Sequence, residues 1–125
     1  MTTEDVPAKL TLRVLEEHDD RFQTYVARCL ETGTIVTGDS MEEAHDLLME
    51  TLQMEVIQAG RARRAYALFE KPAGPRYELR WQVLAAEQAP YEDTVTVFDA
   101  PLGARKGVRS EISILGVKRA AAVAG

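Results

Sequence analysis

Residues 21–60 constrain the fold of this chain most, because a strand pattern leads there directly into a well-capped helix. Residues 22–30 and 35–37 are rich in apolar, aromatic and β-branched side chains, and a glycine-containing turn separates the two runs. Ser40 and Glu43 then form a capping-box pattern, in which each side chain accepts a hydrogen bond from the backbone N–H of the other. The segment therefore predicts two strands followed by a helix.

The helix is expected over residues 41–58, because its apolar residues recur at intervals of three and four. We expect four of them to face the sheet: Leu47, Leu48, Leu52 and Val56. Upstream, residues 10–15 alternate apolar with polar side chains, which is the period of a half-buried strand. Residues 16–21 are five charged residues and one histidine, so they are predicted to form an exposed hairpin turn.

These elements predict an α+β fold, an antiparallel three-stranded sheet with one helix packed across it. A proline- and glycine-rich break suggests that residues 1–70 form this β-β-β-α domain and residues 71–125 a C-terminal extension. Within the extension, residues 77–84 and 94–98 are predicted strands, and residues 111–117 a last strand or short helix. The extra strands would extend the sheet or pair with another subunit. Because open sheet edges are often closed by self-association, we expect a homodimer or higher homo-oligomer.

Composition favours a cytoplasmic location. The chain of 125 residues has the size of one ordinary domain, and its single cysteine, Cys29, cannot form an internal disulfide. No apolar run approaches the roughly 18–20 residues that a membrane span requires, so no membrane partner is expected. The first residues have neither a basic start nor an apolar stretch, which argues against a signal peptide.

Charge is distributed unevenly along the chain. Residues 1–60 hold thirteen Asp and Glu against four Lys and Arg, whereas residues 61–125 hold seven against eleven. The acidic half suits a basic protein partner, and the basic half suits an acidic one such as nucleic acid. The candidate residues for the protein partner are Glu16, Glu17, Asp19, Asp20, Glu42 and Asp46. The alternative, a stand-alone nucleic-acid-binding regulator, would use the basic C-terminal loop with Arg105, Lys106 and Arg109.

Signals of catalysis are few. The sequence holds no G-x-S-x-G motif, no phosphate-binding glycine loop, no Cys/His cluster and no H-E-x-x-H. His18 is expected in the solvated turn and His45 on the surface of the helix. We therefore predict no catalytic residue, no metal and no cofactor. The enzyme alternative is a nuclease that would have to bring Glu16, Asp39 and Glu43 together.

Part of the chain resembles the HicB-like antitoxin family. The resemblance rests on the aromatic and aliphatic strand over residues 25–33, the Gly-Asp-Ser turn at 38–40 and the Glu-Glu-Ala helix start at 42–44, and it covers roughly residues 10–60. It implies a partial RNase H-like fold without a nuclease centre, in a protein that neutralises a small basic toxin that cleaves messenger RNA. Many members also bind operator DNA through a separate C-terminal module, but no helix-turn-helix or ribbon-helix-helix pattern is present here.

Overall fold

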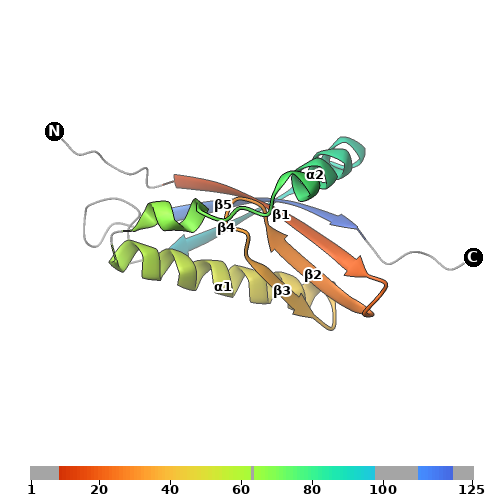
Figure 1. Cartoon of the computed structure of the whole chain (residues 1–125), viewed down its shortest axis with the longest axis horizontal. Helices are drawn as coiled ribbons and strands as arrows, with labels where there is room; N and C mark the ends of the chain where they lie inside the picture. The colour runs from red at the N-terminus through yellow and green to blue at the C-terminus, as the bar shows by residue number, and fades with distance from the viewer. Residues whose placement is uncertain (1–8, 63, 98–109, 120–125) are drawn as a thin grey trace, which may run out of the picture.

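A five-stranded mixed sheet with a helix on each face forms the body of the protein (Figure 1). The computed structural model describes residues 9–62, 64–97 and 110–119. In chain order its elements are β1 (Lys9–Asp19), β2 (Thr24–Cys29), β3 (Ile35–Gly38), α1 (Met41–Arg61), the 3₁₀ helix η1 (Ala65–Phe69), α2 (Pro75–Glu87), β4 (Tyr91–Val97) and β5 (Ser110–Arg119). The predicted α+β class is confirmed.

The strands lie in the order β3-β2-β1-β5-β4. Three neighbouring pairs of strands are antiparallel: β1 with β2, β2 with β3, and β4 with β5. In contrast, β5 runs parallel to β1 along nine paired residues. The predicted antiparallel three-stranded sheet is therefore only part of a larger mixed sheet. The division of the chain into two parts at residue 70 stays a prediction. β1 comes before this position in the sequence and β5 after it, and the two strands are neighbours in the middle of the sheet.

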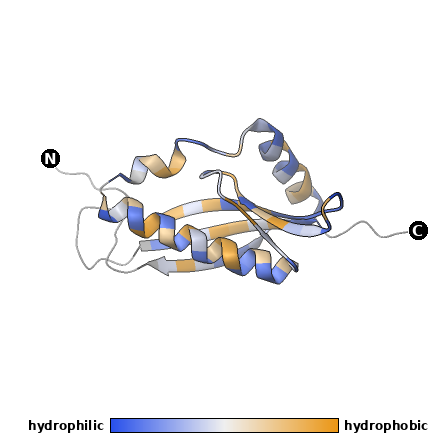
Figure 2. Cartoon of the chain, turned by 60° about the horizontal axis from the view of Figure 1, so that its bottom comes forward, coloured by the Kyte–Doolittle hydropathy of each residue, from blue (hydrophilic) through white to orange (hydrophobic). Residues whose placement is uncertain are grey.

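α1 covers one face of the sheet and buries the main core. Its residues Leu48, Leu52 and Val56 are buried as predicted, together with Ala44. They pack against the apolar side chains Leu12, Val14, Ala27, Cys29, Ile112 and Ile114, and apolar segments of the strands lie behind α1 in Figure 2. The prediction for Leu47 is wrong, because this side chain lies beyond the edge of the buried stripe and is 42% exposed. The helix also continues past residue 58 to Arg61.

The start of α1 is fixed by the predicted cap, with one change of partner. The Glu43 N–H donates to Ser40 Oγ at 3.0 Å, as expected. The Glu43 carboxylate, however, accepts from the backbone N–H of Asp39 at 2.9 Å rather than from that of Ser40. Gly38 is required just before the cap, because a Cβ there would lie 2.7 Å from the backbone nitrogen of Ala44.

The strand predicted over residues 77–84 is wrong, because this segment lies in helix α2. Pro75 occupies the first turn, where its fixed φ suits a helix and its missing N–H costs nothing. Tyr77, Trp81 and Leu84 then recur at helical spacing and pack over the second face of the sheet. The two-residue period of a strand would place Leu79 and Val83 on the same face as Tyr77 and Trp81. They lie on the outer side of the helix instead, 63% and 52% exposed.

The exposed turn predicted over residues 16–21 is also wrong in its first half. β1 continues to Asp19 and pairs with β2 through His18 and Tyr25, so Glu16, Glu17 and His18 are buried side chains of a strand. The remaining predicted strands exist with shifted ends, as the bounds of β2, β4 and β5 show. None of the helices in the described ranges combines the length and apolar character that a membrane crossing requires.

Candidate functional site

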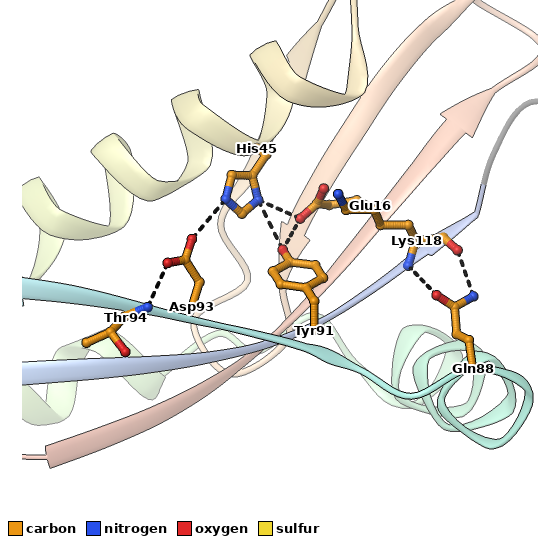
Figure 3. A network of polar contacts seen from close by, with 7 residues as sticks. All are labelled: Glu16, His45, Gln88, Tyr91, Asp93, Thr94 and Lys118. Atoms are coloured by element: carbon orange, nitrogen blue, oxygen red, sulfur yellow. Dashed lines mark hydrogen bonds and ion pairs between the residues drawn. The ribbon is translucent and has the colours of Figure 1, made fainter.

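A buried carboxylate at the centre of the sheet organises a polar network between β1, α1 and β4 (Figure 3). Glu16 continues the inward-facing row of Leu12 and Val14 on β1, and its side chain is fully buried. A buried carboxylate is costly unless it is paired and hydrogen-bonded. Here Glu16 Oε2 accepts from the Tyr91 hydroxyl and lies 2.8 Å from His45 Nδ1. The network therefore stabilises an otherwise unfavourable charge in the core.

His45 lies between two carboxylates. Its Nδ1 faces Glu16, and its Nε2 lies 3.3 Å from Oδ2 of Asp93. The other carboxylate oxygen of Asp93, Oδ1, accepts from the Thr94 N–H at 2.8 Å. Only the protonated ring can donate to both carboxylates at once. Burial lowers the pKa of His45, but the hydrogen bonds and charges of Glu16 and Asp93 outweigh that effect and raise it. The geometry thus favours an imidazolium that bridges β1 and β4.

Tyr91 reaches Glu16 because the residue opposite it in the neighbouring strand, β5, is a glycine. In the sheet Tyr91 pairs with Gly116 of β5, and a Cβ at Gly116 would lie 2.0 Å from a ring carbon of Tyr91. Burial, followed by the hydrogen bond and the charge of Glu16, raises the pKa of the Tyr91 phenol, so this group stays a donor. Gln88 fixes the approach to β4 by donating its amide to the Lys118 carbonyl at 2.9 Å (Figure 3).

Gly116→Ala is expected to lower the free energy of unfolding by about 2 kcal/mol, the range observed for overpacking a tight interior site. The added methyl group displaces the Tyr91 ring and breaks its hydrogen bond to Glu16. Urea denaturation measures the effect. Ser113→Ala in the same strand is the control, because its side chain lies on the opposite face, and an equal loss for both variants would contradict this role of Gly116.

The network joins β1, α1 and β4 through a carboxylate that is itself shielded from solvent. Glu16 has no exposed surface, so a substrate in solvent cannot reach its carboxylate. Among the described residues, no group of three or more His, Cys, Asp and Glu side chains could hold a metal ion. The network fixes the first turns of α1 against β1 and β4, and so positions the outer face of that helix.

The outer face of α1 is acidic and partly apolar. Four exposed carboxylates and two exposed apolar side chains follow one another at helical spacing, and we call them the acidic α1 face: Glu42, Glu43, Asp46, Leu47, Glu50 and Met54. Leu47 is 42% exposed and Met54 54%. The sequence from residue 41 to residue 60 contains no Lys or Arg. This face therefore combines negative potential with an apolar contact surface.

A second polar cluster lies on the α2 side of the sheet. Arg13 of β1 donates from Nε to Glu31 at 2.6 Å and holds both oxygens of Glu78 of α2 through its two terminal nitrogens. Its guanidinium carbon lies 5.5 Å from the centre of the Trp81 ring. Glu17, the next carboxylate on this face of β1, is paired with an arginine of α2. These contacts attach α2 to the sheet.

A shallow hollow of about 390 Å³ opens between the end of α1, η1 and the loop before β3. Its wall is mostly apolar, with Leu68 and three alanines, and it carries one carboxylate, Glu55, and one guanidinium, Arg64. The Glu55 carboxylate already accepts from the Thr34 hydroxyl at 2.6 Å. The hollow therefore offers less unused polar chemistry than the acidic α1 face.

The structure separates the predicted partner-binding acids into three groups. Glu16 and Glu17 are wrong as surface residues, because both are buried and paired inside the fold. Asp19 and Asp20 lie at the β1–β2 turn, where Asp19 accepts from two backbone N–H groups and Asp20 pairs with His18. The third group, Glu42 and Asp46, is exposed on the acidic α1 face. The basic loop with Arg105, Lys106 and Arg109 lies outside the described residues.

The nuclease alternative gains no support from the placement of its acids. Asp39 and Glu43 are both at the exposed start of α1, where the Glu43 carboxylate is used to accept from the Asp39 N–H. Glu16 is buried with Tyr91 and His45. His18 is not in a solvated turn either, since its ring packs edge-on against Tyr25 at 4.8 Å.

His45, Tyr91 and Asp93 are members of one site that the sequence did not predict. A usable signal existed for Glu16, because the two-residue period of Leu10, Leu12 and Val14 continues to it. An acid on the inward face of a strand requires a partner, which is a reason to search for a histidine or tyrosine elsewhere. Nothing local identifies Tyr91, because its approach to Glu16 depends on the pairing of β4 with β5.

No family model, no curated protein and no solved structure matches this chain. Function is therefore inferred from the contacts and charges of the described residues.

Proposed function

We propose that this chain is a non-catalytic binding protein, a HicB-like antitoxin or a related regulator, that engages a basic protein through the acidic α1 face. The observation that carries the proposal is the composition of that face. Four exposed carboxylates share this helix face with exposed Leu47 and Met54, and residues 41–60 contain no Lys or Arg. Such a surface attracts a basic partner over distance and then excludes water around an apolar contact.

The acidic face is held rigidly, which lowers the entropic cost of binding. The opposite side of α1 is buried through Leu48, Leu52 and Val56, and Ser40 caps its first turn. His45 joins that turn to β1 and β4. A partner would therefore meet a surface that is already in its bound arrangement.

The turn between β1 and β2 extends the same negative region. The Thr24 hydroxyl donates to the Gly38 carbonyl at 2.9 Å, so the start of β2 lies beside the end of β3, two residues before the cap of α1. Asp20 is exposed near this point. The revised candidate surface thus keeps Asp19, Asp20, Glu42 and Asp46 from the sequence-based set and adds Glu43 and Glu50.

The test uses the product of the gene next to that of this chain, provided that it encodes a small basic protein. The triple variant Glu42→Gln, Asp46→Asn and Glu50→Gln is expected to bind it about tenfold more weakly, at about 0.5 kcal/mol for each exposed ion pair. Isothermal titration calorimetry at two salt concentrations measures the change. The wild-type affinity should also fall with salt more steeply than that of the variant.

The matched control removes three exposed carboxylates elsewhere, with Glu70→Gln, Glu87→Gln and Glu92→Gln. It changes the net charge equally and should leave the affinity within about twofold, as expected for charges outside the contact. Equal weakening by both triple variants would mean that only net charge matters. That result, or a neighbouring gene that encodes no basic protein, would contradict the proposal. The predicted homo-oligomer stays a prediction, to be tested by sedimentation of the chain alone.

A further inference from the structure

Three arginines surround one aromatic ring on the face of the protein opposite α1. The guanidinium carbon of Arg28 lies 4.1 Å from the centre of the Tyr77 ring, that of Arg80 5.5 Å and that of Arg76 5.7 Å. Arg28 comes from β2, and the other three residues come from the first two turns of α2. We call these four residues the Tyr77 cluster. Segments distant in the sequence thus bring three cations to one place.

The carboxylates of this region are already engaged. Glu31 and Glu78 both bind Arg13, through Nε and through the two terminal nitrogens respectively. Glu17 binds Arg80, with Oε1 2.8 Å from the arginine Nη1. One of the three arginines of the cluster is therefore neutralised within the protein.

Arg28 and Arg76 have no carboxylate partner among the residues that the structure describes. The Nε of Arg28 is buried without a hydrogen-bond acceptor, and the guanidinium carbon lies over the Tyr77 ring. Arg76 is exposed at the start of α2. Two like charges beside one ring repel each other, and in a chain of net charge −5 this local positive excess requires an explanation.

We propose that the Tyr77 cluster binds the phosphate group of a small phosphorylated molecule. A planar guanidinium presents parallel N–H donors that match the oxygens of a phosphate, and a phosphate dianion would neutralise both unpaired charges. The Arg28 guanidinium already lies over the Tyr77 ring, which reduces the side-chain entropy lost on binding. The cluster is compact and centred on a single ring, which suits one phosphorylated group rather than an extended polymer. This site is separate from the acidic α1 face and independent of the proposed function.

Inorganic pyrophosphate is the probe, titrated into the full chain at constant ionic strength and followed by calorimetry and by the thermal unfolding midpoint. Saturable binding with a raised midpoint is expected. Arg28→Gln and Arg76→Gln should each weaken it about tenfold, the loss expected when a charge-assisted hydrogen bond is removed. Arg64→Gln is the matched control and should change nothing, because Arg64 lies outside the Tyr77 cluster, beside a different ring, Tyr66, at 5.9 Å.

Arg28 is half-buried, so its substitution can destabilise the fold, and the unfolding midpoint of each variant without pyrophosphate reveals such a loss. Arg76 is exposed, so the Arg76→Gln variant tests the site even in that case. Absence of saturable pyrophosphate binding would overturn the proposal. So would binding that Arg76→Gln leaves unchanged or that Arg64→Gln weakens equally. A single-stranded oligonucleotide that binds through Arg28 and Arg76 more tightly than pyrophosphate would also overturn it, because the ligand would then be a nucleic acid.

Discussion

Glu16→Ala is expected to lower the free energy of unfolding by about 3–5 kcal/mol, the cost of removing one partner from a buried charged pair. The variant removes the carboxylate that His45 Nδ1 and the Tyr91 hydroxyl share, and it leaves those two groups 3.0 Å from each other. It also creates a cavity between β1 and α1, because Glu16 is fully buried. Equilibrium urea denaturation measures the loss.

Tyr91→Phe is the companion variant for Glu16→Ala. It removes the hydrogen bond of the hydroxyl to Glu16 and its contact with His45 Nδ1, but it leaves the contact between Glu16 and His45, so its expected cost is smaller, about 1.5–3 kcal/mol. A Glu16→Ala loss below about 0.5 kcal/mol, typical of exposed positions, would mean that Glu16 is not a buried paired carboxylate. Glu42→Ala on the acidic α1 face provides that reference value in the same protein.

The stability of the wild-type chain is expected to fall as pH rises above about 6.5, the ordinary pKa of histidine. The folded-state pKa of His45 is raised, so the protonated ring stabilises the fold fully below the unfolded value. That contribution is lost as pH rises through the folded value. The groups that face His45 are Glu16, Asp93 and Tyr91, and Glu16→Ala should flatten this dependence because it removes the main carboxylate partner.

Arg13→Ala is expected to cost about 2–3 kcal/mol, because it removes charge-assisted bonds to two carboxylates and the cation–π contact with Trp81. The loss of these contacts should detach α2 locally from the sheet. Trp81 is the single tryptophan of the chain, so a red shift of its fluorescence reports this detachment separately from global unfolding.

Arg21→Ala is the control for Arg13→Ala, since Arg21 is exposed at the β1–β2 turn, and its expected effect is within about 0.5 kcal/mol. Unchanged tryptophan emission in Arg13→Ala would contradict the attachment of α2 through Arg13. The partial exposure of the Arg13 side chain, 27%, is the reason that the expected cost stays below that of Glu16→Ala.

The sequence predicts well those elements whose signals are local. The capping residues Ser40 and Glu43 placed the start of α1 at the correct residue, and the helical spacing of Leu48, Leu52 and Val56 identified its buried face. The β-branched run over residues 35–37 agreed with β3. In each case the neighbours along the chain are enough to decide the structure.

The errors arise where contacts distant in the sequence decide. Tyr77 and Trp81 fit both a strand period of two and a helix period of four, and the choice depends on how they cover Leu15 and Val117. Glu16 looked like part of a turn by its charge, but partners 29 and 75 positions away make its burial favourable. Local polarity could not reveal those partners.

Methyl NMR of the chain titrated with its basic partner tests the proposed role of the acidic α1 face most directly. Leu47 and Met54 lie on that face, whereas Leu79 and Val83 are comparably exposed on α2. Shifts or broadening of the Leu47 and Met54 methyl signals, with Leu79 and Val83 unchanged, are the expected result. Changes at Leu79 and Val83 with Leu47 and Met54 unaffected would contradict it and place the partner on the opposite face.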